Sequence, residues 1–165
     1  MNLNIPTTIT KINSNFLHKK RIEIFIKRDD LIHKIISGNK WRKLKYNFQE
    51  AKKMGHNSIL SFGGAYSNHL HALSYACNQM NFKSVGVVRG DMHKNLNATL
   101  SFCSKHNMTL HYIDRYSYKT HKDSDNLLTK LKNKFGKFYV IPEGGSNALG
   151  VKGCQEILTE IDLDF

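Results

Sequence analysis

Cysteine is scarce in this chain, and its spacing excludes two kinds of small stabilised domain. The three cysteines, Cys77, Cys103 and Cys154, are an odd number, lie far apart and form no CxxC pair. A disulfide framework needs paired cysteines, and a structural zinc site needs ligands at short spacing. The sequence therefore predicts neither.

Histidine is more frequent, but its arrangement does not predict a metal centre. None of the nine histidines belongs to an HExxH pattern or stands beside a suitable carboxylate. We expect no bound metal, and we expect most of the central histidines to lie at the surface or in loops: His69, His71, His93, His106 and His111.

Long apolar runs are also absent. The amino-terminal sequence, MNLNIPTTITKINSNF, lacks the apolar core of a signal peptide, and no later stretch is long enough to cross a bilayer. We therefore expect no membrane partner and predict a cytoplasmic location.

Acidic residues are few: 13 Asp and Glu stand against 25 Lys and Arg, which gives a formal net charge of +12. Such a balance raises the possibility of nucleic-acid binding, because a basic surface attracts phosphates. The lysines are scattered, however, and no Arg-rich tract, zinc-finger spacing or RNP-type motif accompanies them. We attribute the charge to compositional bias and predict no nucleic-acid partner.

The apolar pattern alternates between the period of a strand and that of a helix. We expect strands at residues 22–27, 58–62, 84–88, 109–113 and 138–141, and helices at 40–54, 68–80, 96–106, 126–135 and from about 150. Residues 114–125 are polar and predict no element. This order predicts an α/β fold with a parallel twisted sheet and helices on both faces. Ligands of such sheets lie beyond the carboxyl ends of the strands.

Lys40 is the first candidate for chemistry. The segment SGNKWRKL places it after a Gly-Asn turn at the start of an amphipathic helix, one turn before Lys43. A neighbouring cation and the positive end of a helix dipole both penalise the ammonium form, and neutral lysine is a nucleophile that forms Schiff bases with aldehydes. The alternative is an ordinary solvated surface lysine.

The segment SFGGAYSNHLHA follows the second expected strand and supplies Ser67 and Asn68 at a helix start. Both residue types are common helix N-caps, so a purely structural role is one interpretation. The other is that these side chains and the exposed amides hold an anion or a polar ring substituent. A third segment, PEGGSNALG, contains Glu143, and here we favour a structural loop that borders the site.

Together, KRDDL, SGNKWRKL and SFGGAYSNH resemble the pyridoxal-phosphate enzymes of the 1-aminocyclopropane-1-carboxylate deaminase and D-cysteine desulfhydrase family, within the tryptophan-synthase-β-like group of fold type II. The resemblance implies that Lys40 forms the Schiff base with pyridoxal 5'-phosphate and that Lys43 contacts its phosphate. It also implies that Asn68 binds the ring hydroxyl and that Ser67 is a catalytic residue on the substrate side. His69 completes the motif as a possible substrate-binding residue.

The resemblance also implies a two-lobed fold of which only part is present. Residues 44–150 match the small lobe, residues 1–43 match the amino-terminal part of the large lobe, and residues 151–165 match the start of its remainder. Family members continue well past this point, into a phosphate-binding loop and further substrate contacts that the sequence does not contain. We therefore expect a carboxyl-terminally incomplete enzyme.

The expected function is the amino-terminal portion of a lyase or deaminase that converts a small amino acid into a 2-oxo acid and ammonia. D-cysteine and 1-aminocyclopropane-1-carboxylate are both candidate substrates, with a slight preference for D-cysteine. We expect little or no activity from the chain alone. The alternative is a non-catalytic lobe that associates with a separate carboxyl-terminal half or with a second copy.

Overall fold

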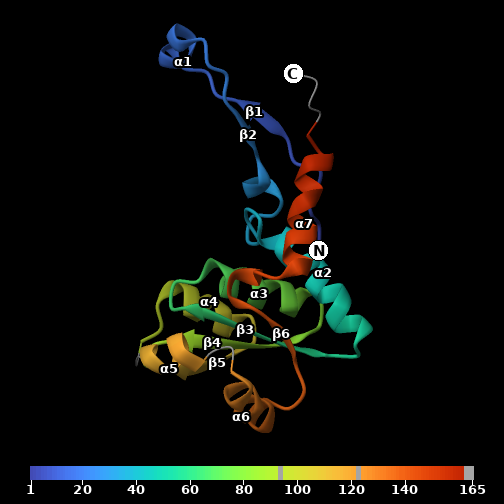
Figure 1. Cartoon of the computed structure of the whole chain (residues 1–165), viewed down its shortest axis with the longest axis vertical. Helices are drawn as coiled ribbons and strands as arrows, with labels where there is room; N and C mark the ends of the chain where they lie inside the picture. The colour runs from blue at the N-terminus through green and yellow to red at the C-terminus, as the bar shows by residue number, and fades with distance from the viewer. Residues whose placement is uncertain (93–94, 122–123, 162–165) are drawn as a thin grey trace.

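The computed structural model describes residues 1–92, 95–121 and 124–161. Its centre is a four-stranded parallel sheet in the order β5-β4-β3-β6 (Figure 1). The strands are β3 (Ser58–Gly64), β4 (Lys83–Arg89), β5 (Met108–Ile113) and β6 (Tyr139–Ile141). In the register of the sheet, Ile59 of β3 lies opposite Ser84 on one side and Tyr139 on the other.

Helices cover both faces of this sheet, which confirms the expected fold class. One core lies between the sheet and α2 (Lys40–Lys53), α3 (Asn68–Gln79) and α4 (Ala98–Lys105). A second core lies on the opposite face, under α5 (Arg115–His121) and α6 (Asp125–Phe135) (Figure 1). The chain then forms a short 3₁₀ turn at Glu143–Gly145 and the last helix, α7 (Ala148–Thr159).

Strand β3 shows why both faces are covered. Its side chains alternate between the two cores, so that Ile59 joins the first, while Leu60 and Phe62 join the second. Residues 58–63 are all buried. A strand covered on both faces has an almost continuous apolar sequence, as SILSF shows.

Helix α5 is an element that the sequence pattern does not predict, because it lies in the polar stretch 114–125. Tyr118 is the buried side chain that holds it to the sheet, 2% exposed and edge-on to Phe62 with ring centroids 6.2 Å apart. A short helix with one buried side chain among its described residues has no apolar repeat that a sequence pattern could reveal.

The amino-terminal residues form an arm that projects away from the sheet (Figure 1). It consists of β1 (Ile9–Lys11), α1 (Asn15–Lys20) and β2 (Phe25–Lys27), with β1 and β2 antiparallel. The strand expected at 22–27 is therefore confirmed only from Phe25 onward, and β1 and α1 were not expected. A 3₁₀ turn at Asp29–Leu31 leads back toward the sheet.

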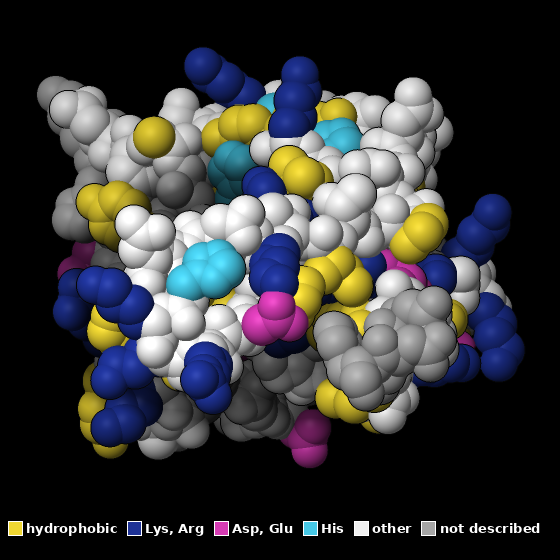
Figure 2. All heavy atoms as spheres, turned by 90° about the horizontal axis from the view of Figure 1, so that it is seen from above, with side chains coloured by type: hydrophobic (Ala, Val, Ile, Leu, Met, Phe, Trp, Pro, Cys, Tyr) yellow, Lys and Arg dark blue, Asp and Glu magenta, His cyan; other side chains and the backbone are white. Residues whose placement is uncertain are grey.

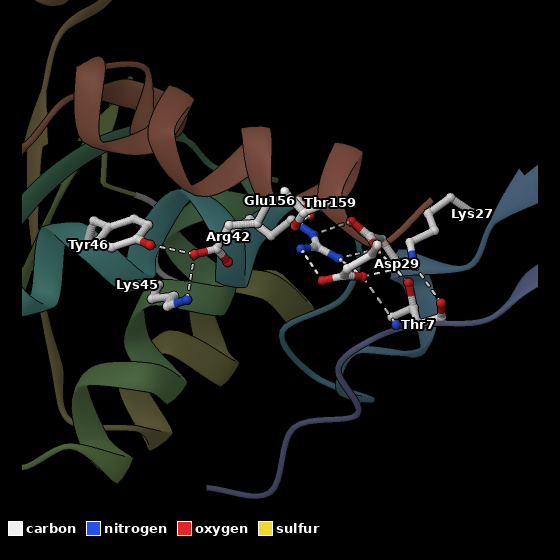
Figure 3. Close-up of polar contacts among 9 residues, drawn as sticks. Thr7, Lys27, Asp29, Arg42, Lys45, Tyr46, Glu156 and Thr159 are labelled. Atoms are coloured by element: carbon white, nitrogen blue, oxygen red, sulfur yellow. Dashed lines mark hydrogen bonds and ion pairs between the residues drawn. The ribbon is translucent and has the colours of Figure 1, made fainter. Parts of the chain in front are cut away.

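A buried charge cluster joins this arm to α2 and α7. The Arg42 side chain is fully buried; Nε and Nη2 donate to Asp29 at 2.7 and 2.9 Å, and Nη1 and Nη2 each donate to Glu160 at 2.9 Å (Figure 3). Lys27 of β2 forms a further ion pair with Glu160 at 2.8 Å. Helices α2 and α7 also touch through their backbones, since a Cβ added at Gly153 would lie 1.9 Å from the Arg42 carbonyl oxygen.

None of the helices in residues 1–92, 95–121 and 124–161 is long and apolar enough to cross a membrane. Figure 2 shows Lys and Arg side chains at separate places on one face rather than in a single band. Within the same described ranges, no group of three or more potential metal ligands is found, and His93 lies outside them.

Candidate functional site

The residues expected to carry chemistry lie where β3 and β6 end and where α2 and α3 begin. Lys40 is the first residue of α2, and Asn68 is the first residue of α3, directly after β3 and its loop. Helix starts and carboxyl strand ends thus meet at one edge of the sheet, the usual position of a ligand in a parallel α/β fold.

The surroundings of Lys40 favour its neutral form. Its Nζ donates to the Asn39 Oδ1 atom at 2.8 Å, and its side chain is half-buried. Partial burial lowers the pKa of Lys40, and the positive charge of Lys43 lowers it further. The like-charge effect expected from the sequence is therefore present, but burial is the larger cause.

Lys43 and Gly145 form one wall of a cavity of about 630 Å³. Gly145 has a φ of +67°, and a Cβ added to it would lie 3.1 Å from Lys43 Cβ and 3.5 Å from His69 Cε1. A side chain at Gly145 would therefore press on both residues. The opposite wall is α7, whose Val151, Cys154 and Leu158 make the cavity mainly apolar.

His69 lies behind this wall and is 3% exposed. Its Nε2 is 2.8 Å from the Oγ atom of Ser61, a fully buried residue of β3. Burial lowers the pKa of His69 to about 4, with smaller contributions from Lys40 and Lys43, while Glu143 acts in the opposite direction. The imidazole is therefore neutral at pH 7, and the three basic residues of the motifs lie within electrostatic reach of one another.

Ser67 and Asn68 stand slightly apart from this group. Ser67 caps α3, because its Oγ accepts from the Leu70 amide at 3.2 Å, and a Cβ on Gly63 would lie 2.5 Å from that oxygen. Asn68 is exposed at the first position of the helix. Among the described residues, no hydrogen bond joins Ser67 or Asn68 to Lys40, so the structure confirms the capping role and leaves the catalytic and cofactor-binding roles as predictions.

The PEGGSNALG segment is fixed to α2 by a pair of side-chain amides. Asn147 Nδ2 donates to Asn47 Oδ1 at 2.8 Å, and Asn47 Nδ2 donates to the Lys43 carbonyl oxygen at 2.8 Å. Asn147 also caps α7 by accepting from the Gly150 amide at 2.8 Å. This supports the expectation of a structural loop beside the site, although the sequence pattern had not indicated Asn47 or Ser61.

No family model matches the chain, but individual relatives do. A Thermotoga maritima protein whose name assigns it provisionally to 1-aminocyclopropane-1-carboxylate deaminase is 34% identical over 162 residues, which is 98% of this chain and 52% of the relative. The Arabidopsis thaliana protein named bifunctional D-cysteine desulfhydrase/1-aminocyclopropane-1-carboxylate deaminase, mitochondrial, is 34% identical over 96% of this chain and 41% of its own length. A solved structure described as an ACC deaminase homologue matches with a TM-score of 0.82 and 26% identity, over 100% of this chain and 50% of that one.

Over nearly its whole length the chain is similar to members of the 1-aminocyclopropane-1-carboxylate deaminase and D-cysteine desulfhydrase family. This confirms the resemblance drawn from the three loops. The family depends on pyridoxal 5'-phosphate, and the relatives are named as enzymes. Serine racemase from Dictyostelium discoideum shares the fold, with a TM-score of 0.67 at 18% identity.

The chain spans about half the length of the deaminase and desulfhydrase relatives that it matches. The GNKWRKL and SNH motifs of the chain both lie at the edge of the sheet where the strands have their carboxyl ends. Lys40, Lys43 and His69 form the compact part of the candidate site, whereas Ser67 and Asn68 lie at its margin.

Proposed function

We propose that this chain supplies the lysine-bearing part of a pyridoxal-phosphate lyase or deaminase that acts on a small amino acid. One observation carries the proposal: the half-buried Lys40 stands at the start of α2 with its pKa lowered by burial and by Lys43, in a chain similar to this family. The lowered pKa leaves a larger fraction of this amine neutral, and the neutral amine is the form that reacts with an aldehyde. When bound, the cofactor would act as the electron sink of the reaction.

The residues present fit the aldehyde end of this cofactor. Lys40 provides an amine of weakened basicity, and the absence of a side chain at Gly145 leaves space beside Lys43. His69 adds a buried nitrogen, Nδ1, that lacks a hydrogen-bond partner among the described residues. The lowered pKa of Lys40, the space beside Gly145 and the unpaired Nδ1 of His69 together support the binding of a polar ligand at Lys40.

Each motif residue then has a proposed task. Lys40 would hold the cofactor and, once released by the substrate amine, carry a proton between its Nζ and a substrate carbon. Lys43 would neutralise negative charge on the cofactor phosphate, and Asn68 would orient the ring through its hydroxyl. Ser67 would contact the substrate, and its cap to α3 would fix the position of its oxygen.

The products would be a 2-oxo acid and ammonia, with sulfide released in addition if D-cysteine is the substrate. D-cysteine and 1-aminocyclopropane-1-carboxylate remain the two proposed substrates, since relatives carry both names. We also propose that residues 44–150 form the small lobe and that residues 1–43 and 151–165 belong to the large one, of which 162–165 lie outside the described residues. The cytoplasmic location and the absence of a nucleic-acid partner stay predictions.

Chemical trapping tests the cofactor assignment. The chain is incubated with substoichiometric pyridoxal 5'-phosphate, reduced with borohydride and digested, and the labelled peptides are identified by mass spectrometry. We expect the label to concentrate on Lys40, because a larger fraction of this amine is neutral than of an exposed lysine. Equal labelling of Lys40 and the exposed Lys52 would contradict the proposal. We also expect little turnover of D-cysteine by the chain alone.

A second candidate function is that of an interaction module that binds the polypeptide corresponding to the rest of the family fold. Strand β2 and the residues before it are apolar and exposed on both faces, with Ile24, Phe25 and Ile26 each 39–45% exposed. On α7, Val151 and Leu158 are 58% and 66% exposed. The arm and α7 lie on the same side of the sheet (Figure 1). This chain covers 50% of the solved ACC deaminase homologue, so an equal length of that homologue lies outside the match.

A binding measurement tests this module. The unmatched half of the Thermotoga maritima relative is expressed separately, and its association with this chain is measured by light scattering and titration calorimetry. We expect Leu158→Asp to weaken binding by about tenfold or more, since burying a carboxylate in an apolar contact costs at least about 1.4 kcal/mol. Tyr116→Asp is the matched control, because Tyr116 is 75% exposed on α5. Equal effects of the two variants, or no association at all, would argue against the module.

A further inference from the structure

The contact between Ser61 and His69 defines the protonation of the histidine ring. Ser61 Oγ donates to the Pro142 carbonyl oxygen at 3.4 Å and lies 2.8 Å from His69 Nε2. A hydroxyl has one hydrogen, so both contacts can be hydrogen bonds only if the hydroxyl donates to the carbonyl oxygen and His69 Nε2–H donates to Oγ. This arrangement places the ring hydrogen on Nε2 and forms two hydrogen bonds, whereas the other tautomer forms one.

The other ring nitrogen is then a bare acceptor. Among the described residues, no hydrogen-bond partner is found for His69 Nδ1, although the atom is buried. Buried acceptors are rarely left without a donor in a native protein, and the exceptions are often at functional sites. The ring is held close to the cavity, since its Cε1 is 3.5 Å from the position that a Cβ on Gly145 would take.

The surrounding charges indicate which donor fits. Lys40 and Lys43 both lie near enough to the ring to disfavour a positive imidazole, and burial disfavours it more strongly. A neutral acceptor among cationic groups attracts an N–H donor, whereas an imidazolium would repel one. The ligand group that would approach Lys40 and carry such hydrogens is the amino group of an amino acid.

We propose that Ser61 is a positioning residue that fixes His69 as its Nε2–H tautomer, so that Nδ1 accepts a hydrogen bond from the amino group of a bound amino acid. The identity of this donor rests on the proposed function. The tautomer itself does not, because the Ser61 and Pro142 contacts exist without any ligand. His69 thus acts as a neutral acceptor and not as an acid.

Nuclear magnetic resonance of the cofactor-free full chain, labelled with ¹⁵N and ¹³C in histidine, tests the tautomer. At pH 7 we expect Nε2–H to exceed Nδ1–H by at least about fivefold, the ratio that corresponds to the net contribution of one hydrogen bond. In Ser61→Ala this excess should fall toward equal populations. Ser84→Ala, which removes another buried serine on the neighbouring strand, should leave it unchanged. A predominant Nδ1–H form or an imidazolium in the wild type would overturn the inference.

A second arm tests the donor. Pyridoxal 5'-phosphate is added first, and D-alanine, which has no leaving group at its β-carbon, is added next. We expect the Nδ1 resonance to move on addition of D-alanine in the wild type and to move at most half as far in Ser61→Ala. An Nδ1 resonance that D-alanine leaves unchanged would overturn the acceptor role. Failure of the cofactor to label Lys40 would instead overturn the proposed function, and the tautomer measured without cofactor would stand.

Discussion

Replacing Lys40 with alanine will abolish the specific attachment of pyridoxal 5'-phosphate to this chain. Partial burial and the neighbouring Lys43 both lower the pKa of Lys40 and so enlarge its neutral fraction. After borohydride reduction, mass spectrometry of Lys40→Ala should show only the low, scattered labelling of exposed lysines. Lys40→Arg should behave in the same way, because a guanidinium keeps the positive charge but does not form a Schiff base at neutral pH.

The control for this result lies on the same helix. Lys52 is exposed in the last turn of α2, so Lys52→Ala should leave the labelling at Lys40 unchanged. If Lys40→Ala retained a specific, saturable label on another residue, that residue and not Lys40 would be the cofactor lysine. Circular dichroism of each variant would show that the helix itself persists.

The second large effect is expected from Arg42→Met, which should lower the free energy of unfolding by about 3–5 kcal/mol. The variant removes the buried guanidinium that binds both Asp29 and Glu160 and leaves these two carboxylates without it. Most of the loss is the cost of leaving a poorly solvated carboxylate without a counter-charge. The net stabilisation by the ion pair itself is the smaller part. Urea unfolding followed by circular dichroism gives the measurement.

A surface pair provides the comparison. Arg28 also forms two hydrogen bonds to one carboxylate, that of Asp30, but both side chains are substantially exposed. Arg28→Met should therefore change the unfolding free energy far less than Arg42→Met does. Equal losses from the two variants would show that burial of the Arg42 cluster is not the cause.

The same cluster sets a dependence of stability on acid. Hydrogen bonds from Arg42, and from Lys27 to a smaller extent, lower the pKa of Glu160 to about 2, although burial acts against them. Because the pKa of Glu160 is lower in the folded chain than in the unfolded chain, its ionised carboxylate stabilises the folded state. This contribution is complete above the unfolded pKa of 4.5 and is lost as the pH falls from 4.5 toward 2. In Arg42→Met this part of the acid dependence should become smaller, with the contribution of Lys27 remaining.

Local patterns were sufficient to predict the sheet and most of its helices. The strand at Ser58–Gly64 and the helix at Lys40–Lys53 have clear apolar periods, so their existence could be predicted without tertiary information. In the amino-terminal arm, β1 and α1 could not be predicted in this way, because their apolar side chains are exposed and follow no simple pattern of burial. The strand pairing of the arm depends on β1, which has only three residues.

The candidate site was predicted in part, for a similar reason. Lys40 and Lys43 could be identified because they share one short motif, and the position of that motif follows from the helix that it begins. Arg42 stands in the same motif but was not singled out, since arginine is rarely fully buried and its partners are 13 and 118 residues away. The role of Ser61 likewise depends on two contacts that only the folded chain creates.

The distance in sequence between Arg42 and Glu160 also affects the order in which the chain matures on the ribosome. At about 5–20 residues per second, synthesis of the intervening 118 residues takes roughly 6–24 s. Throughout that interval, α2 and Lys40 are already made, but the carboxylate that fastens Arg42 to α7 has not yet emerged. Helix α2, which carries Lys40, is thus among the first elements synthesised and among the last to form all of its tertiary contacts.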